Sequence, residues 1–190
     1  MAEYLISAKT KLLLESLIKY YSQNINVLNS IITQKNTLSL RILDWLVTNY
    51  SKKYNVVYKI KKNNTEVNFN IYLDYKNQLK AYSKKYFDPF CRRERIIINT
   101  KDLSWRLEDN LKEKKNIKIH ELVTTVGQLN FFKWFIENNV LNYAIENIEF
   151  IDKDMIETLN KSKLNNKRKE LSINASKSIC SFDIKTTVQF

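Results

Sequence analysis

The chain has very little of the residue types that usually shape tight turns and metal sites. Its 190 residues include one glycine, one proline, two cysteines and one histidine. Globular proteins normally contain several per cent of both glycine and proline. Because Gly127 stands alone, few turns can require a positive φ angle, and asparagine must serve where one is needed. A glycine-rich phosphate-binding loop is excluded for the same reason.

The scarcity of cysteine and histidine excludes further classes of site. Cys91 and Cys180 are far apart in the sequence and do not form a disulfide framework. A structural zinc site needs about four cysteine or histidine ligands, which is more than this chain provides. We therefore expect reduced, intracellular thiols and no metal ion or other cofactor.

Long apolar runs are also missing. No segment approaches roughly 18 consecutive apolar residues, the length needed to span a membrane as a helix. The first residues have no small-residue cleavage site of the kind that ends a signal peptide. Hydrophobic residues nevertheless make up 44% of the chain and charged residues 27%. These values are typical of globular proteins, so we expect a packed core and no membrane association.

Apolar spacing predicts helices at the beginning of the chain. Residues 3–33 carry apolar side chains three and four positions apart, with a break near Asn24. A second helix is predicted to begin at Asn36 or Thr37, either of which can cap it, and to run to Tyr54. The simplest arrangement of these two helices is a packed pair.

The pattern then changes to alternation, which predicts strands. A β-hairpin is expected with strands near 55–61 and 66–72, joined by a turn that contains two asparagines. The segment DYKNQLKAYSKKYF (74–87) is predicted to be a helix that ends before Pro89. The segment RERIIIN (93–99) is predicted to be a third strand, which completes a small antiparallel sheet.

The remaining sequence predicts further helices and a tail. Residues 101–118 are highly charged and are expected to form an exposed loop with a helical turn. Thr124 or Thr125 together with Gln128 resembles a capping box at the start of a helix that ends near Asn138. More helix is expected up to residue 160.

These elements predict an α+β fold in two parts. Residues 1–160 are expected to form a single globular domain, with an N-terminal helix pair, a small antiparallel sheet and C-terminal helices. Residues 161–190 are expected to form a basic, flexible tail, because the segment lacks large core residues over most of its length.

Positive charge is concentrated in one part of the sequence. The formal net charge is +12, and residues 51–100 alone hold twelve basic and four acidic residues. Two-thirds of the excess therefore lies in the predicted hairpin, the helix after it and the DPFCRR turn. A charge of this sign attracts nucleic acid or an anionic membrane through a field that salt screens.

The basic residues are interleaved with aromatic residues in the run YKNQLKAYSKKYFDPFCRRERI (75–96). On a helix, Lys76, Lys80 and Lys84 share one face. Lysine and arginine bind phosphates, and exposed aromatic rings can stack on unpaired bases. The predicted nucleic-acid-binding residues are Lys76, Lys80, Lys84, Lys85, Arg92, Arg93 and Arg95, with Tyr82 and Tyr86 as candidate stacking groups. Two alternatives stay open: the aromatics are core and the lysines a solvated face, or the partner is an acidic protein.

Other candidate sites have plainer interpretations. His120 and the adjacent Glu121 are residue types that can form an acid–base pair, but no nucleophile motif accompanies them. Cys91 lies between basic residues that would lower its pKa, yet a buried thiol beside Phe90 is the simpler interpretation. Asp152 and Asp154 with Glu149 could hold a metal, but acidic residues near the start of a helix are common. Trp134 lies off the main apolar stripe and is a candidate partner surface.

Two runs together resemble a known group of viral proteins. The run at 75–96 and the run TTVGQLNFFKWFIENNVLNYA (124–144) are similar to an uncharacterised protein family of large nucleocytoplasmic DNA viruses, of the mimivirus and phycodnavirus kind. The resemblance covers roughly residues 38–155. It implies a viral protein made inside the infected host cell, in the cytoplasm or a viral factory, and perhaps packaged in the virion. It implies no activity, cofactor or catalytic residue.

The leading functional hypothesis is a non-enzymatic protein that binds DNA or RNA through backbone contacts with little sequence reading. The alternative is a structural or assembly protein of the virion. That protein would contact other viral proteins through the N-terminal helices or Trp134. A third hypothesis, an enzyme of unrecognised type, has no motif in the sequence to support it.

Overall fold

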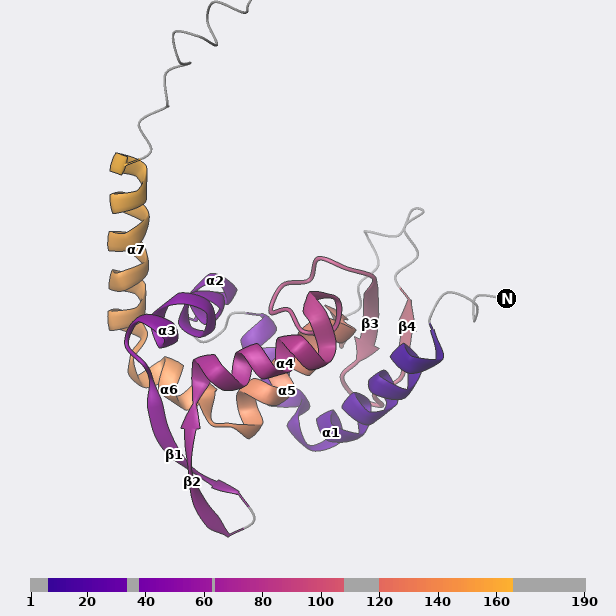
Figure 1. The fold of residues 1–190 in the computed structure, drawn as a ribbon. Helices are drawn as coiled ribbons and strands as arrows, with labels where there is room; N and C mark the ends of the chain where they lie inside the picture. Colours follow the sequence, from indigo (N-terminus) through magenta and orange to yellow (C-terminus); the bar gives the residue numbers. More distant parts are fainter. Residues whose placement is uncertain (1–6, 34–37, 63, 108–119, 166–190) are drawn as a thin grey trace, which may run out of the picture. The chain divides into compact units, whose positions relative to one another are not determined.

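The computed structural model describes residues 7–33, 38–62, 64–107 and 120–165. The chain divides into two compact units, residues 1–155 and residues 156–190. The first unit holds all described elements except the second part of α7 (Ile148–Asn165), which continues into the second unit (Figure 1). The α+β class predicted from the sequence is confirmed.

The first helix, α1 (Ala8–Ile32), is continuous. The Ser7 side chain caps it by accepting a hydrogen bond from the backbone N of Thr10. The predicted break at Asn24 does not occur, because its side-chain amide donates to the Tyr20 carbonyl four residues earlier. The predicted packing partner was wrong as well, since α1 packs principally against α5, the helix after the second sheet.

The second helical segment consists of α2 (Leu40–Trp45), a π-helical turn η2 (Leu46–Tyr50) and α3 (Ser51–Lys53). Its cap is Ser39, whose hydroxyl accepts from the Ile42 backbone N at 3.2 Å. The caps proposed from the sequence, residues 36 and 37, lie outside the described residues. The end predicted at Tyr54 is confirmed.

The predicted hairpin is present as β1 (Val57–Lys62) and β2 (Thr65–Asn70), which pair in antiparallel register. The helix α4 (Ile71–Tyr86) follows β2 without an intervening residue. The helix begins before the predicted start at residue 74, and its cap is Asn70: the Asn70 Oδ1 atom accepts from the Leu73 backbone N at 3.0 Å.

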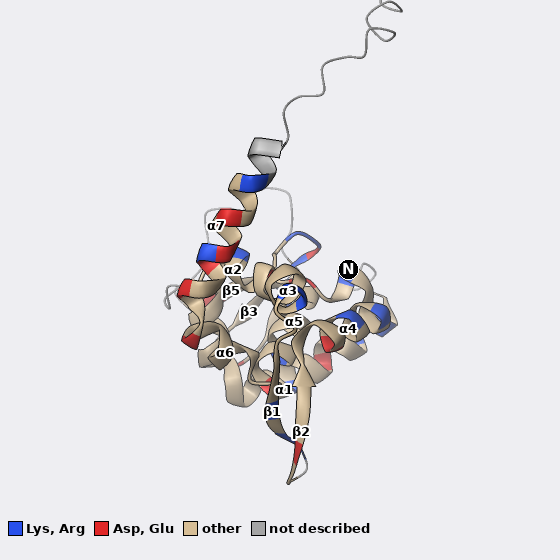
Figure 2. Cartoon of the chain, turned by 60° about the vertical axis from the view of Figure 1, so that its left-hand side comes forward, with Lys and Arg blue, Asp and Glu red and all other residues tan. Residues whose placement is uncertain are grey.

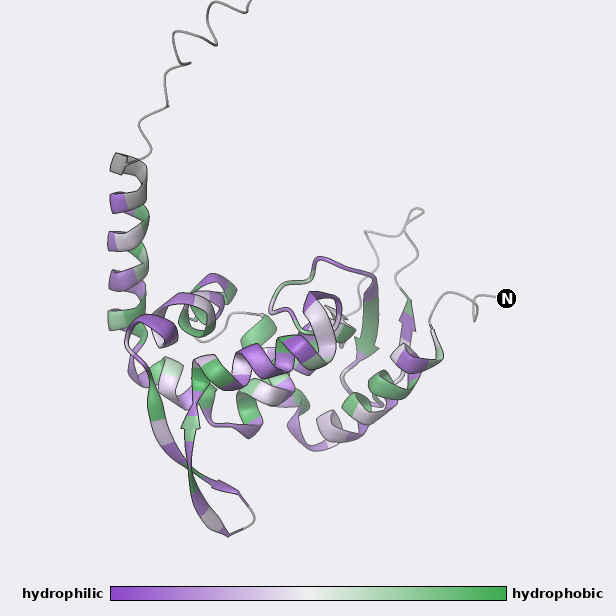
Figure 3. Ribbon diagram, viewed as in Figure 1, coloured by the Kyte–Doolittle hydropathy of each residue, from purple (hydrophilic) through white to green (hydrophobic). Residues whose placement is uncertain are grey.

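The third predicted strand, β3 (Arg95–Asn99), does not join the hairpin. It is the centre of a separate antiparallel sheet in the order β4-β3-β5, with β4 (Trp105–Leu107) and β5 (Glu121–Thr125) on its two edges. The sequence had assigned residues 105–107 to a loop. The three isoleucines of β3 are all buried, so this strand requires cover on both faces. Figure 3 shows the apolar β3 and the largely hydrophilic α4.

The core is built around α5 (Val126–Glu137). Thr125 caps α5 as predicted, and the helix ends at Asn138; α6 (Val140–Glu146) follows Asn139, which is left-handed. Phe131, Phe132 and Phe135 are fully buried. Most of the surface of α5 is covered, because the elements on both sides pack against this helix.

Trp134 is part of this core, so its predicted role as a partner surface was wrong. Only 4% of its surface is exposed, and its indole Nε1 donates to Asp74 Oδ1 at 2.6 Å. Its ring contacts the rings of Phe69 and Tyr75. The partly exposed side of α5 carries Lys133, Ile136 and Glu137, and Trp134 does not lie on it.

The C-terminal predictions are only partly covered. Residues 161–165, predicted to begin the tail, continue α7, and residues 166–190 lie outside the described residues. The domain boundary near residue 160 stays a prediction. Within the described ranges, no helix combines the length and the apolar character that crossing a membrane requires.

Candidate nucleic-acid interface

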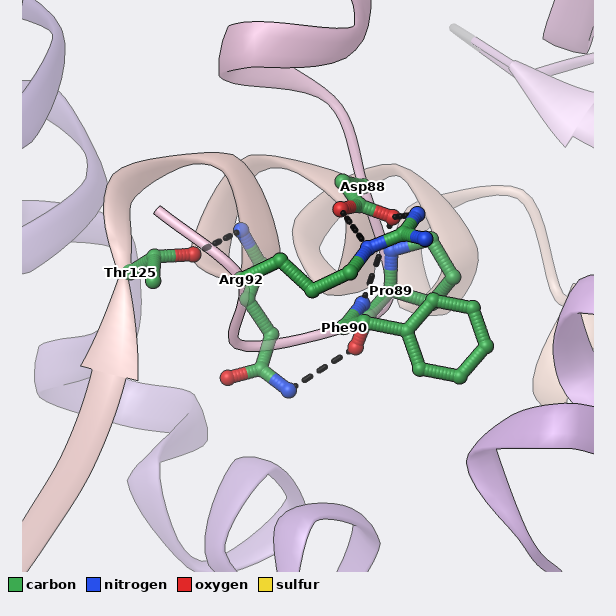
Figure 4. A network of polar contacts seen from close by, with 6 residues as sticks. Asp88, Pro89, Phe90, Arg92 and Thr125 are labelled. Atoms are coloured by element: carbon green, nitrogen blue, oxygen red, sulfur yellow. Dashed lines mark hydrogen bonds and ion pairs between the residues drawn. The ribbon is translucent and has the colours of Figure 1, made fainter. Parts of the chain in front are cut away.

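The turn between α4 and β3 is fixed to the start of α5 by a buried glutamine. The Gln128 side chain donates from Nε2 to the Pro89 carbonyl at 2.8 Å, and its Oε1 accepts from the Thr124 hydroxyl at 2.8 Å. The Gln128 backbone N donates to the Thr125 hydroxyl at 3.1 Å. Figure 4 shows this network around Pro89 and Thr125. The capping pair seen in the sequence therefore also holds the proline turn in place.

Gly127 allows the backbones of the two segments to touch. A Cβ atom at this position would lie 2.9 Å from the Lys85 carbonyl oxygen, closer than real Cβ atoms approach. The Asp88 backbone N donates to the Gly127 carbonyl at 3.2 Å. Asn130 adds a bond from its side-chain amide to the Tyr86 carbonyl at 2.9 Å. Residues 85–89 are thus held on α5 at several points.

Arg92 is tied to this turn. Its Nε and a terminal guanidinium nitrogen donate to the two oxygens of Asp88, at 3.0 and 2.8 Å. The guanidinium also lies 4.7 Å from the centre of the Phe90 ring (Figure 4). The bond to Asp88 raises the pKa of Arg92. Of the predicted phosphate ligands, Arg92 is therefore poorly placed to reach an outside anion.

The row of lysines predicted on one face of α4 is interrupted. Lys76 and Lys80 are exposed and follow regular helix, but Ser83 has φ 57° and ψ 170°. This non-helical residue changes the direction of the chain, so Lys84 does not continue the face that Lys76 and Lys80 share. The prediction that these three lysines share one face was therefore wrong for Lys84.

Five of the predicted phosphate ligands are exposed cations that remain available. None of them forms an ion pair with another residue in the described ranges; they are Lys76, Lys80, Lys84, Lys85 and Arg93. Arg95 is also exposed, at the start of β3. Lys84 acts on Asp44, whose pKa is raised by burial and by Asp88 and is lowered in part by Arg92 and Lys84.

Lys85 and Arg93 lie close to each other in space. Both line a shallow pocket between α1, the end of α4, the second sheet and the start of α5. The hydroxyl-bearing Thr10 and Tyr86 contribute to the same pocket, as does the acidic Glu94. Two predicted phosphate ligands from different elements are therefore brought together.

The two candidate stacking tyrosines are partly used by the fold. The half-buried Tyr82 ring stacks on Phe87, with ring centres 6.5 Å apart and planes 17° apart. The Tyr86 hydroxyl bonds to the Thr10 hydroxyl at 3.0 Å, and that bond is the main cause that lowers the pKa of Tyr86. Phe87 is buried, so the alternative that these aromatics are core is correct for that ring.

The structure adds residues that the motif-based prediction missed. Lys52 of α3 lies with its Nζ 5.8 Å from the centre of the Tyr72 ring in the first turn of α4. Lys59, Lys61 and Lys62 of the hairpin are exposed, and β2 leads directly into α4. Figure 2 shows basic residues on α4 and the hairpin, and both basic and acidic residues along α7. The charge of residues 51–100 was the sequence signal for these lysines.

The remaining candidate sites are engaged or exposed in other ways. His120 is exposed, and its neighbour Glu121 pairs with Arg106 at 3.2 Å, so the two do not form an acid–base pair. Cys91 is half-buried rather than fully buried. Asp154 accepts bonds from Trp45 and Lys53. In the part of the chain that the structure describes, no group of three histidine, cysteine, aspartate or glutamate residues could hold a metal ion.

Comparison with known proteins identifies the family. A model for DUF7197, a family of unknown function, matches residues 3–187. An uncharacterized protein of Acanthamoeba polyphaga mimivirus is 39% identical over 161 residues. That match covers 85% of this chain but only 56% of the mimivirus protein, so the chain spans little more than half of that relative's length. No solved structure matches.

These matches confirm the resemblance to an uncharacterised giant-virus family that the two sequence runs indicated. The likeness to the mimivirus protein covers most of the described elements and both of those runs. The chain belongs to the DUF7197 family.

Proposed function

We propose that this protein binds nucleic acid through phosphate contacts from one basic surface. We call it the α4 surface and define it by Lys52, Lys76, Lys80, Lys84, Lys85, Arg93 and Arg95. The observation that carries the proposal is the set of five exposed cations between residues 76 and 93 that make no ion pair with a described residue. Unneutralised lysines and arginines on one side of a protein are the usual source of non-specific affinity for nucleic acid.

The support around these cations is rigid. The Pro89 turn is bonded to the buried Gln128, and Arg92 is held by Asp88. Arg92 therefore acts as a positioning residue that shapes the turn, and Arg93 next to it is the arginine directed to phosphate. Fixed backbone and mobile lysine side chains suit a phosphate chain, whose charges are evenly spaced.

The same surface offers little to a protein partner. Protein interfaces usually have an apolar or aromatic centre that is fully buried on binding. Among the described residues 71–95, Leu73 is the one large apolar side chain that is strongly exposed, at 60%. The rings of Tyr75 and Phe87 are buried, and the other aromatic residues of this range are half-buried, so none of them presents a fully exposed ring.

The test is a salt series of fluorescence anisotropy with labelled oligonucleotides. Each lost phosphate contact should reduce the slope of log affinity against log salt by about 0.9 on duplex DNA. The variant Lys76→Ala/Lys80→Ala/Arg93→Ala is expected to bind about tenfold more weakly at low salt, with a slope reduced by about 2 to 3. Circular dichroism checks that the variant is folded.

A matched control separates a local surface from general charge. The variant Lys19→Ala/Lys101→Ala/Lys153→Ala removes the same number of positive charges from exposed positions elsewhere. It is expected to keep most of the affinity and the slope. Equal losses in both variants, or no binding by the wild type at about 50 mM salt, would overturn the proposal.

One observation favours a second candidate, a role in assembly. Phe150 at the start of α7 is 66% exposed, and Ile145 at the end of α6 is 46% exposed. Glu146 and Glu149 between them are also exposed. Neighbouring exposed apolar side chains with a polar rim are typical of protein contacts. A contact with another viral protein would use this region and not Trp134, which is buried.

A further inference from the structure

The β1–β2 hairpin extends beyond the packed part of the first unit, and the inference drawn from it rests on the proposed binding of nucleic acid. Ile60 and Phe69 are its last buried residues. All described residues between them, 61–62 and 64–68, are exposed. The hairpin tip therefore projects from the body (Figure 1). A two-stranded ribbon with so little cover contributes few contacts to the core.

The base of the hairpin is nevertheless firmly held. The Tyr58 hydroxyl donates to the Asn138 carbonyl at 2.8 Å, and the Tyr58 ring stacks on Tyr143 with centres 5.6 Å apart and planes 11° apart. The Asn70 side-chain amide donates to Asn55 Oδ1 at 2.9 Å. The direction of the arm is thus fixed by the core, whereas its tip is free to contact a partner.

Toward the tip, one face of the ribbon is polar, and on the same face Val57 at the base is apolar and 47% exposed. In the observed register Lys59 lies opposite Asn68 and Lys61 lies opposite Glu66, and alternate residues of a strand share a face. Lys59 Nζ lies 3.3 Å from a Glu66 oxygen in an exposed pair. Lys62 is on the other face, over the Phe69 ring. Among the described strands, β1 and β2 pair only with each other.

We propose that this hairpin enters the major groove of a DNA duplex while the α4 surface contacts the adjacent phosphates. Paired strands are about 4.8 Å apart, and the major groove of B-form DNA, about 12 Å wide, admits a two-stranded ribbon. Lysine can donate to the guanine acceptors, and asparagine can bond to adenine in two places. Lys59, Lys61 and Asn68 carry these functions on the face that would meet the bases.

The connection between β2 and α4 supports simultaneous contact. Because α4 begins at the residue after β2, Lys76 lies only about one and a half turns, or roughly 8 Å, from the base of the arm. Phosphates flank the groove, so lysines at that distance fall beside a ribbon that occupies it. The arm and the α4 surface then form one continuous binding surface.

The proposal selects duplex DNA over other nucleic acids. The major groove of A-form RNA is deep and narrow, and side chains cannot read it. Single strands have no groove, and proteins that bind them present open aromatic faces. Tyr82 and Tyr86 are partly covered by Phe87 and Thr10, so these two rings do not present open faces.

The experiment compares duplex DNA, duplex RNA of the same sequence and single-stranded DNA at one salt concentration. The readout is the ratio of the affinities, compared with that of a control variant that loses the same charge. The variant Lys59→Ala/Lys61→Ala/Asn68→Ala is expected to lower the affinity for duplex DNA by about tenfold beyond any loss on the other two nucleic acids. A control variant, Lys19→Ala/Lys101→Ala, loses the same charge and should keep the wild-type ratio.

A second measurement identifies the groove. Methyl green, which occupies the major groove, should displace the wild type from duplex DNA, whereas netropsin in the minor groove should not. Equal wild-type affinity for all three nucleic acids, an unchanged ratio in the hairpin variant, or displacement by netropsin alone would overturn the groove proposal and leave the α4 surface standing. No binding to any of them would overturn the proposed function itself.

Discussion

At the scale of single residues, Ser83 has an unusual backbone conformation for a residue other than glycine. Its φ of 57° and ψ of 170° fall in a region that is essentially restricted to glycine. Non-glycine residues held there cost about 1 to 3 kcal/mol. The Ser83 hydroxyl accepts from the Lys85 backbone N at 3.3 Å, which offsets a small part of that cost. The non-helical conformation of Ser83 separates Lys84 and Lys85 from Lys76 and Lys80, which lie earlier in α4.

Replacing Ser83 by glycine should relieve the strain. We expect Ser83→Gly to raise the free energy of unfolding by about 1 kcal/mol, measured by urea denaturation. The matched control is Ala81→Gly, two residues earlier at an exposed helical position. There the substitution should lower the free energy of unfolding by about 1 kcal/mol. A loss of stability in both variants would contradict the strained conformation.

Asparagine takes the positive φ angles that glycine usually serves, as the composition predicted. Asn55, Asn64 and Asn139 all have positive φ. The sequence could not predict Ser83 or Leu103, which also have positive φ. Neither residue has a side chain that favours this region; Leu103 lies in the tight turn between β3 and β4, where its backbone N donates to the Asn99 carbonyl at 2.9 Å. Gly127, in contrast, lies in a helix and serves close contact.

At the scale of elements, features that depend on residues close together in the sequence were predicted better than features that depend on residues far apart. The cap at Thr125, the end of α5 and the hairpin were all readable, because each depends on residues within a few positions of one another. The membership of β3 in a second sheet was not, because β4 has only three residues and β5 lies more than twenty residues away. The α4 surface was partly predictable from charge, but the capture of Arg92 by Asp88 required the fold.

Asp154 joins α7 to the second helical segment within the first unit. Its carboxylate accepts from the Trp45 indole at 2.9 Å, from the Tyr54 hydroxyl at 3.1 Å and from Lys53. Burial alone would raise the pKa of Asp154, but the bonds from Lys53, Trp45 and Tyr54 outweigh it and lower the pKa below its ordinary value. The ionised form is therefore the one that stabilises the fold.

We expect Asp154→Asn to lower the free energy of unfolding by about 1 to 3 kcal/mol at pH 7. Because the pKa of Asp154 is lower in the folded state, its contribution is present above the unfolded pKa of about 4 and is lost as the pH falls through the folded pKa. The deficit of the variant should therefore shrink between about pH 4 and the lowest accessible pH. Urea denaturation at several pH values measures it.

A neighbouring aspartate provides the control for this prediction. Asp152 lies two residues earlier in α7 and is half-buried. Asp152→Asn should change the free energy of unfolding by less than about 0.5 kcal/mol, as is usual for sites without such bonds. A deficit in Asp154→Asn that stays constant across the pH range would contradict the stabilising role of the ionised carboxylate.

At the scale of the whole molecule, the two signs of charge are separated along the chain. Residues 51–100 contain twelve basic and four acidic residues, whereas residues 120–157 contain two basic and seven acidic residues. The basic stretch carries the α4 surface and the hairpin, and the acidic stretch carries the exposed Phe150 and Ile145. The proposed binding of nucleic acid and the proposed contact with a protein would therefore use different residues, so one proposal does not exclude the other.

The assembly candidate makes its own prediction. If Phe150 anchors a contact between copies, the sedimentation coefficient of the wild type should rise with protein concentration, and Phe150→Ser should remove that rise. The control is Leu12→Ser on α1, an apolar residue of similar exposure at 67%. A wild type that sediments as a monomer at every concentration would leave the exposed Phe150 without a role in self-association.

The direct junction between β2 and α4 has a mechanical consequence. Asn70 ends the strand, caps the helix through Leu73 and is bonded to Asn55 beside the first strand. No loop residue lies between β2 and α4. A force that turns the hairpin tip would therefore also turn the axis of α4. We therefore expect the hairpin and α4 to move together as one rigid body about the point where the Tyr58 hydroxyl bonds to the Asn138 carbonyl.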